Sequence, residues 1–343
     1  MKAKFVISKS KVLEQYQLVD KLSSITSYSS KTNPDITPIL EENTTCLFTI
    51  HTVNELKHIK ERSRCFFLAQ GWNNRLIEQL LDQNINKFGV DNLTDLDFLI
   101  KYLEDTNHQV ELMLRVKLKE HSIRTERYFV FGMDCLTINK KIKELNDHPN
   151  ITALGIHFHR KTQNIAEWNL VYEIEQMFDK ETLEIINVMN IGGGLPSIYA
   201  NVNVKVFDSI YKKILDLKKW LAEKDIKLML EPGRFISAPA VKLITNIISL
   251  YENNIIVDAS IYNSDTDAII VPVKLLVEGE LNKDEGDAYV IKGITPCSMD
   301  LFRYRVYLKD PQVGDKIVFL NAGAYNFTTD FCDLEKLETE VIE

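Results

Sequence analysis

The chain has 343 residues, of which 45% are hydrophobic and 26% charged, and its formal net charge is −8. This length exceeds that of most single domains, so we expect one large domain together with a smaller one. The negative charge argues against nucleic acid or an anionic membrane as the main partner, because both attract basic surfaces. No apolar run reaches the roughly 20 residues of a membrane span. The five cysteines are scattered without metal-type spacing and no signal peptide is evident, so we expect reduced thiols, a cytoplasmic location and no metal site.

Short apolar runs alternate with longer amphipathic segments from about residue 24 to residue 235. The apolar runs predict eight strands, at Ser24–Ser30, Leu47–Ile50, Cys65–Leu68, Lys87–Val90, Glu111–Val116, Ala153–Phe158, Ile186–Met189 and Lys227–Leu230. Segments between them have the spacing of amphipathic helices, for example Val53–Glu61, Asn74–Asp82, Asp95–Leu103 and Val204–Lys224. Eight strand–helix alternations predict a (β/α)8 TIM-type barrel, whose functional residues lie at the C-terminal ends of the strands.

The pattern changes after about residue 240. Short β-branched or alternating runs separated by polar turns predict strands at Val241–Ile248, Asn254–Val257, Ala268–Val277, Ala288–Ile291 and Lys316–Leu320. We therefore expect an α/β protein in which a barrel over residues 8–240 precedes an all-β domain, a sheet or a small barrel, over residues 241–343.

Two short motifs lie directly after predicted strands. Gly192-Gly193-Gly194 follows the run that ends at Met189, and three glycines leave backbone amides open to an anion such as phosphate. Glu231-Pro232-Gly233-Arg234 follows the next predicted strand and brings an acid, a rigid turn and a guanidinium together. In this order the two motifs favour a site for a phosphate-bearing ligand.

The two motifs together resemble the phosphate loop and the Glu-Pro-Gly-Arg motif of the pyridoxal phosphate (PLP) decarboxylases of ornithine, diaminopimelate and arginine, which share the alanine-racemase-like fold type III. Three further segments fit that family in the same order: residues 28–34 (Tyr-Ser-Ser-Lys-Thr-Asn-Pro), 155–159 (Gly-Ile-His-Phe-His) and 323–325 (Gly-Ala-Tyr). The five segments span residues 28–325. The resemblance also implies that an N-terminal strand at Lys4–Ile7 joins the β domain, so that about residues 1–7 belong to it.

The resemblance implies a role for each motif in holding PLP. Lys31 would carry the cofactor covalently and His159 would stack on its ring, so both are candidate catalytic residues. Glu231 would keep the ring nitrogen protonated, which helps the cofactor to take up the electrons left on the α-carbon by decarboxylation. The candidate phosphate contacts are Gly192, Gly193, Gly194, Gly233, Arg234 and Tyr325. Without the resemblance, Lys31 reads as a solvated lysine, His159 as a structural histidine and Glu231 as the acid of a Pro-Gly turn.

The chain departs from the family pattern at two places. Arg160-Lys161-Thr162 replaces the usual Val-Gly-Ser, which makes Thr162 the candidate for the missing serine. Residues 293–300 read Gly-Ile-Thr-Pro-Cys-Ser-Met-Asp, where the ornithine enzymes have Gly-Pro-Thr-Cys-Asp-Ser-x-Asp in a loop that enters the partner subunit's site. Cys297 is thus a candidate catalytic residue and, with Asp300, a candidate substrate contact. The loop lacks the acid that receives the distal ammonium of a diamine-type substrate, so the substrate and its stereochemistry stay open.

These features predict a PLP-dependent amino-acid decarboxylase, a lyase of amino-acid metabolism and polyamine biosynthesis, that works as a homodimer with its active site at the subunit interface. Candidate substrates are a basic amino acid such as ornithine, or a carboxylated polyamine. An amino-acid racemase is one alternative, although Thr32-Asn33-Pro34-Asp35 does not match the segment expected after its lysine. The other alternative is an inactive homologue that acts as a binding or regulatory partner. The altered loop favours this reading, whereas the retained Lys31, Glu231 and Arg234 argue against it.

Overall fold

The computed structural model describes residues 2–118, 131–160, 163 and 168–343, which form two compact units. The barrel unit contains residues 16–196 and 205–233. The β unit contains residues 1–15, 197–204 and 234–343. Segments 8–15, 197–204 and 234–240 thus group with the β unit, although the sequence predicted a barrel over residues 8–240. Among the described helices, none combines the length and apolar character that crossing a membrane requires.

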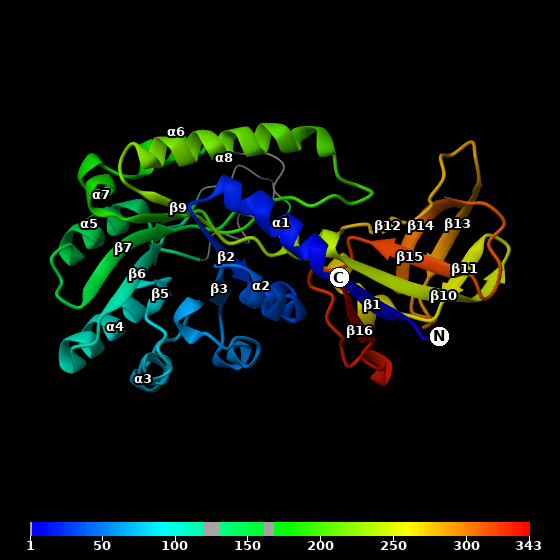
Figure 1. Ribbon diagram of the computed structural model, residues 1–343, viewed down its shortest axis with the longest axis horizontal. Coiled ribbons are helices and arrows are strands. Elements are labelled where there is room, and N and C mark those ends of the chain that lie inside the picture. Colours follow the sequence, from blue (N-terminus) through cyan, green and yellow to red (C-terminus); the bar gives the residue numbers. More distant parts are fainter. Residues whose placement is uncertain (1, 119–130, 161–162, 164–167) are drawn as a thin grey trace. The chain divides into compact units, whose positions relative to one another are not determined.

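In the described part of the barrel unit, eight parallel strands close on themselves in chain order (Figure 1). They are β2 (Ile25–Ser29), β3 (Leu47–Ile50), β4 (Cys65–Ala69), β5 (Lys87–Val90), β6 (Val110–Arg115), β7 (Ile151–His157), β8 (Val188–Asn190) and β9 (Lys227–Leu230). Closure comes from the pairing of β2 with β9, in which Thr26 lies opposite Leu230. The (β/α)8 barrel and all eight predicted strands are confirmed.

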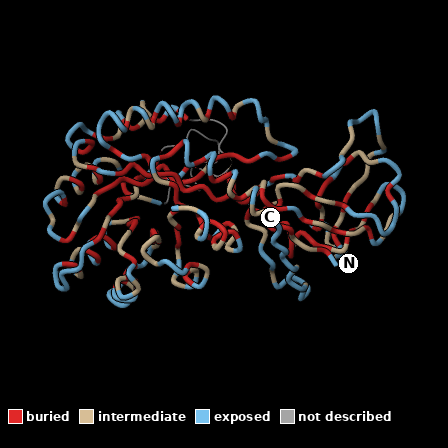
Figure 2. Tube along the Cα trace, in the orientation of Figure 1, coloured by how far each residue is buried: buried red, intermediate tan, exposed pale blue. Residues whose placement is uncertain are grey.

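The barrel strands are buried along most of their length (Figure 2). Short runs of aromatic and branched residues suit strands that are covered on both faces. Phe66, Leu68, Met113, Val188 and Met229 form one cluster that joins β4, β6, β8 and β9. Close packing also explains a glycine in β7, because a β-carbon on Gly155 would lie 2.8 Å from the carbonyl oxygen of Val188.

The helices of the barrel unit are amphipathic and several begin at a side-chain cap. They include α2 (Thr37–Asn43), α3 (Asn74–Asp82), α4 (Leu93–Thr106), α5 (Cys135–Leu145), α6 (Leu170–Met177), α7 (Lys180–Ile185) and α8 (Phe207–Ala222). The side chains of Asn73, Asn92, Asp134 and Asp179 accept hydrogen bonds from the first turns of α3, α4, α5 and α7. In α8 the buried face contains Ile210, Ile214, Leu217 and Leu221, as the apolar spacing predicts. Helix α1 (Lys9–Leu22), which was not predicted, precedes the first barrel strand.

The β unit is built on an eight-stranded sheet over its described residues, and this confirms the predicted β domain. Its strands are β1 (Lys4–Ser8), β10 (Val241–Tyr251), β11 (Asn254–Val257), β12 (Leu276–Val277), β13 (Asp287–Lys292), β14 (Leu301–Leu308), β15 (Lys316–Leu320) and β16 (Glu338–Ile342). Strand β1 pairs antiparallel with β10, so the N-terminal strand joins this sheet as expected. Three short helices accompany the sheet: α9 (Arg234–Ser237), α10 (Ile261–Ser264) and α11 (Asp267–Ile270).

The predicted strand at Ala268–Val277 is wrong. Residues Asp267–Ile270 form α11, and only Leu276–Val277 pair in the sheet. Side-chain bonds override the β propensity of this segment: the hydroxyl of Thr266 donates to the carbonyls of Tyr325 and Phe327, and Asp267 pairs with Arg234. Pro272 cannot donate a ladder bond either.

Candidate active site

The predicted site residues of the barrel unit all follow the C-terminal ends of its strands. Lys31 lies in a 3-10 turn after β2, His159 lies two residues after β7, Gly192–Gly194 follow β8, and Glu231 directly follows β9. Because parallel strands of a barrel end at the same rim, the fold gathers these residues at one end of the barrel.

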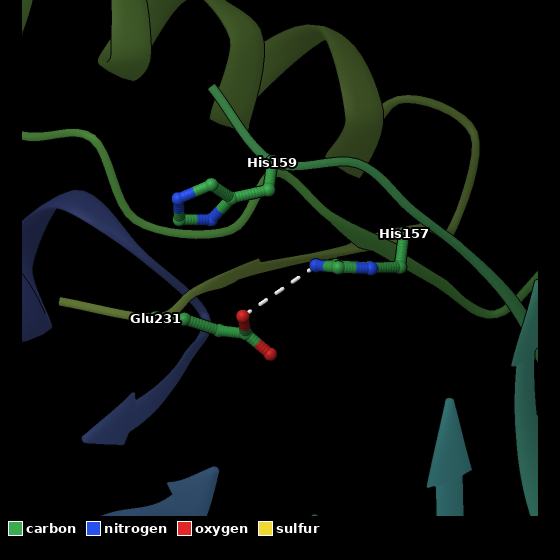
Figure 3. Close-up of side chains that lie close together, drawn as sticks. All are labelled: His157, His159 and Glu231. Carbon is green, nitrogen blue, oxygen red and sulfur yellow. Dashed lines mark ion pairs between the residues drawn. The ribbon is translucent and has the colours of Figure 1, made fainter. Parts of the chain in front are cut away.

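Glu231 is buried, with 5% of its surface exposed, and its carboxylate is held by three other strands. Its Oε1 accepts hydrogen bonds from the hydroxyl of Thr49 at 3.1 Å and the amide of Asn190 at 2.9 Å. Its Oε2 lies 3.5 Å from Nε2 of His157 (Figure 3). Burial alone would raise the pKa of Glu231, but His157, the Asn190 amide and His159 hold it below its ordinary value. The site therefore contains an ionised carboxylate inside the barrel rim.

His157, Asn190 and Thr49 were not predicted as site residues. All three are fully buried polar side chains within strands that are otherwise apolar. The ring of His157 lies edge-on to Phe66, with 6.5 Å between the ring centroids. A polar residue in an apolar strand run, close to its C-terminal end, was the signal that would have found them.

The glycine loop turns tightly against His159 and Glu231. Gly192 has φ +67°, and a β-carbon there would lie 2.7 Å from Nδ1 of His159 and from the carbonyl oxygen of Phe158. A β-carbon on Gly193 would lie 2.7 Å from the carbonyl oxygen of Glu231. The amide of Gly193 donates to Nδ1 of His159 at 3.2 Å, so a neutral ring carries its proton on Nε2.

Lys31 and His159 both keep exposed side-chain surface at a rim crowded by protein atoms. Burial lowers the pKa of Lys31, and the carboxylates of Glu231 and Glu55 only partly oppose this effect. Burial also lowers the pKa of His159 to about 3. The rim thus offers an amine that loses its proton more readily than a solvated lysine, and a neutral imidazole.

A second charged pair, which was not predicted, lies near these residues. Arg115, at the end of β6, pairs with Asp91 at 2.9 Å, and the amide of Gln70 donates to the same carboxylate at 2.7 Å. Arg115 contributes to the lowered pKa values of Lys31 and His159, which places a positive charge close to both.

In the β unit, Arg234 and Tyr325 are brought together. The guanidinium of Arg234 forms a two-pronged ion pair with Asp267, donates to the Tyr199 hydroxyl at 2.8 Å and lies 5.3 Å from the centroid of the Tyr325 ring. Asp267 and Tyr199 were not predicted. Because Asp267 engages both terminal nitrogens, a phosphate at Arg234 would share the guanidinium with this carboxylate.

Cys297 and Asp300 also lie in the β unit, in the loop that follows β13. Asp300 is buried, and its carboxylate accepts hydrogen bonds from the Ile261 amide at 2.9 Å and from the Thr295 amide and hydroxyl at 3.0 and 2.7 Å, so it fixes the loop. The half-buried Cys297 has its Sγ 3.2 Å from the Tyr262 hydroxyl. That contact lowers the pKa of Cys297 and raises the pKa of Tyr262 to about 12. Thr162 lies outside the described residues.

Residues 14–238 match the pyridoxal binding domain of the pyridoxal-dependent decarboxylases. The chain belongs to this family. On geometry alone, His157, His159 and Glu231 could hold a metal ion, since one side-chain atom from each lies within 4.8 Å of the others. These three residues lie within the matched pyridoxal binding domain, so family membership favours a pyridoxal cofactor over a metal ion for the domain.

Individual relatives of this family are distant. The chain is 26% identical over 264 residues to a diaminopimelate decarboxylase of Archaeoglobus fulgidus, covering 70% of this chain and 62% of the relative. It is 23% identical over 269 residues to antizyme inhibitor 2 of Xenopus laevis, covering 70% of this chain and 58% of the relative. The chain thus spans about three fifths of the length of these curated relatives. The crystal structure of lysine/ornithine decarboxylase from Vibrio vulnificus, complexed with putrescine, has the same fold, with a TM-score of 0.82, 21% identity, and coverage of 99% of this chain and 94% of that chain.

The residues at the rim fit pyridoxal phosphate. A buried carboxylate held by Thr49, Asn190 and His157 suits a protonated ring nitrogen, and a neutral histidine ring suits stacking on an aromatic face. The glycine loop carries no side chains, and an anion there would share the amides of Gly192 and Gly193 with Asn190 and His159, to which they already donate hydrogen bonds.

Proposed function

We propose that this chain is a PLP-dependent carboxy-lyase that removes the α-carboxylate of an amino acid. The observation that carries the proposal is the ionised Glu231, held by three strands at the same barrel rim as Lys31. When bound, the cofactor supplies an electron sink for the pair left on the α-carbon as carbon dioxide departs.

Three of the proposed site residues of the barrel unit have distinct roles. Lys31 holds the cofactor through Nζ, which its lowered pKa favours as a neutral amine. Glu231 accepts a hydrogen bond from the ring nitrogen and keeps the proton on it, because an anionic partner stabilises the protonated form. The neutral ring of His159 packs on the cofactor and shields one face from water.

The phosphate is assigned to backbone amides and to one cation. Gly192, Gly193 and Gly194 form the phosphate loop of this proposal, in which β-carbons on Gly192 and Gly193 would clash with neighbouring atoms, and Gly233 is likewise crowded by Thr32. The phosphate would share the amides of Gly192 and Gly193 with Asn190 and His159. Arg234 and the hydroxyl of Tyr325 complete the proposed set.

Cys297 is assigned as the donor of the proton that replaces the carboxylate on the α-carbon. Its thiol lies beside the Tyr262 hydroxyl and would donate to the α-carbon after carbon dioxide has left. By resemblance, the loop 293–300 enters the site of a second copy, so we propose a cytoplasmic homodimer with two shared sites that uses neither nucleic acid nor a membrane.

Only one feature of the sequence limits the choice of substrate, namely the lack of a free acidic side chain in loop 293–300. Residues 293–300 lack a free acid, since the carboxylate of Asp300 is occupied by three donors of its surroundings. The candidate substrates are ornithine, lysine, arginine, diaminopimelate and carboxylated polyamines. A group outside this loop would have to bind the distal cationic group of the substrate.

The test is an absorbance spectrum of the purified protein with PLP, followed by carbon dioxide release from L- and D-ornithine, lysine, arginine, diaminopimelate and carboxylated polyamines. We expect a visible band that shifts with one substrate as gas evolves, and neither signal from Lys31→Ala. A bound chromophore without gas from any of them would contradict decarboxylation of these substrates and point to a different substrate or to racemisation.

A second function is an inactive binding partner, favoured by the similarity to antizyme inhibitor 2 and by the altered loop 293–300. It predicts no chromophore at all, because such a partner has no need of the cofactor. Retention of Lys31 and of the complete carboxylate network around Glu231 supports the enzyme instead.

A further inference from the structure

His51 occupies the same place after β3 that Lys31 occupies after β2. The two strands are adjacent and parallel, with Ser29 opposite Thr49. Lys31 and His51 each come two residues later, so they leave the barrel at the same level of the rim. The 3-10 turn Ser30–Thr32, which contains Lys31, also packs against β3. The two residues are therefore neighbours on adjacent strand ends, close enough for the charge of Lys31 to act on the ring of His51.

The hydrogen bonding of His51 fixes which ring nitrogen is basic. Its Nδ1 lies 2.8 Å from the carbonyl oxygen of Leu68. A carbonyl oxygen only accepts hydrogen bonds, so Nδ1 carries the proton and Nε2 of the neutral ring keeps its lone pair. Nε2 is buried and has no hydrogen-bond partner among the described residues. A buried acceptor without a donor destabilises the folded protein. We therefore expect Nε2 of His51 to accept a hydrogen from a donor during the reaction.

The backbone around His51 is held in place by Glu55. Its Oε1 accepts hydrogen bonds from the amides of His51 at 2.8 Å and Thr52 at 2.9 Å. The half-buried ring is thus fixed at both its side chain and its backbone.

Three charged groups act on the ring of His51: Lys31, Glu55 and Glu231. Burial and the charge of Lys31 lower the pKa of His51, while Glu55 and Glu231 oppose them, so the ring is neutral at neutral pH. A neutral imidazole beside a lysine is able to accept its proton.

We propose that His51 is the proton acceptor for Lys31. An N–H bond of the Lys31 ammonium breaks and an Nε2–H bond forms on His51, which leaves Nζ as a neutral amine and the ring as imidazolium. The proton returns to Nζ when the amine is released from the cofactor. This inference rests on the proposed function, because it requires that Lys31 holds the cofactor.

The test uses full-length protein stripped of PLP, to which PLP is added before trapping with borohydride and mass spectrometry of the Lys31 peptide. In His51→Asn the side-chain amide keeps the bond to Leu68 but has no titrating acceptor. We expect adduct formation on Lys31 to slow by roughly 10²-fold while its final amount is unchanged. His148→Asn is the matched control, because His148 lies between α5 and β7, at the opposite end of a barrel strand. It should react at the wild-type rate.

Two further readouts separate proton transfer from a structural role. As the pH falls through the lowered pKa of His51, protonation of the ring should slow the wild-type reaction, and His51→Asn should keep only the dependence due to Lys31. Free imidazole should accelerate adduct formation in His51→Ala in a concentration-dependent way.

A wild-type rate and pH profile in His51→Asn, or no response of His51→Ala to imidazole, would overturn the inference alone. If the wild-type protein forms no adduct on Lys31, the proposed function itself fails and the role of His51 falls with it.

Discussion

At the scale of single residues, Lys31 and Glu231 place opposite charges at the barrel rim. Burial lowers the pKa of Lys31, whereas Glu231 stays ionised because hydrogen bonds and a nearby histidine outweigh its burial. A readily deprotonated amine beside a fixed carboxylate is what covalent attachment of a cofactor with a protonated ring requires.

Lys31→Ala should abolish the borohydride-trapped PLP adduct, because no other lysine is assigned to the site. The measurement is peptide mass spectrometry after trapping. Lys87→Ala is a suitable control, since Lys87 is half-buried and pairs with Glu111 at the start of β5. An adduct of unchanged yield in Lys31→Ala would exclude Lys31 as the attachment site.

Glu231→Gln keeps the shape of the side chain but removes its charge. The protein should still bind PLP on Lys31, while kcat falls by roughly 10²-fold because the ring nitrogen is no longer held protonated. Thr49→Val removes a single hydrogen bond to the same carboxylate and should lower kcat only about tenfold. Steady-state kinetics that show equal kcat for Glu231→Gln and wild type would contradict the assignment.

The lowered pKa of His159 predicts how the stability of the cofactor-free protein depends on pH. Its ordinary pKa is 6.5 and its folded pKa is about 3, so the unfolded chain binds more protons between these values. The contribution of the neutral His159 ring to the stability of the folded protein is complete above pH 6.5 and declines as the pH falls toward 3. Thermal midpoints between pH 6.5 and 5 should therefore fall less steeply in His159→Phe than in wild type or in His148→Asn, with His51 responsible for part of the remaining slope. Equal slopes in all three proteins would argue against a lowered pKa of His159 in the folded protein.

At the scale of elements, the shape of the proposed site depends on the backbone conformation of the glycine loop after β8. Gly192 combines a positive φ with contacts to Phe158 and His159, so both its conformation and its lack of a β-carbon are required.

Gly192→Ala should weaken PLP binding much more than it lowers the melting temperature. Gly279→Ala is the matched control, because Gly279 has φ +75° but no atom lies within 4 Å of the position that a β-carbon would take. It bears only the strain of the left-handed conformation, about 1 kcal/mol, and should bind PLP normally. Equal PLP dissociation constants for the two variants in a titration would exclude the loop from cofactor binding.

The barrel strands could be predicted because each is a short apolar run between amphipathic helices, and the motif residues could be placed because they follow those runs. Strand β14 was missed because Arg303 and Arg305 interrupt its apolar pattern, although Arg303 is buried through bonds to Glu280 and the carbonyl of Leu275. Strand β16 was missed because its sequence, Glu-Thr-Glu-Val-Ile, is largely polar.

The supporting residues of the site were harder to predict than its motifs. His157, Asn190 and Asp267 act through contacts between segments far apart in the chain, and single-sequence patterns do not report such contacts. Tyr199 likewise reaches Arg234 from 35 positions away.

At the scale of the whole molecule, the proposed site residues are divided between the two units. Lys31, His159 and Glu231 belong to the barrel unit, whereas Arg234, Cys297 and Tyr325 belong to the β unit. In the proposed homodimer, loop 293–300 would enter the partner's site, so that each site would depend on two chains.

Mixing Lys31→Ala chains with Cys297→Ala chains should restore activity that neither variant has alone. Random pairing gives half of the dimers as hybrids, each with one intact site, so roughly a quarter of the wild-type activity is expected. Native mass spectrometry of one isotope-labelled variant would confirm that subunits exchange. Confirmed exchange without recovered activity would contradict a shared site.

The most direct test of the decarboxylase is mass spectrometry of the products formed by the PLP-loaded protein from candidate amino acids in deuterium oxide. Decarboxylation predicts carbon dioxide and an amine that carries one deuterium on the former α-carbon, with no product from Lys31→Ala. An amino acid that keeps its carboxylate but gains α-deuterium would show a racemase, and unchanged amino acids across all candidate substrates would contradict the decarboxylase.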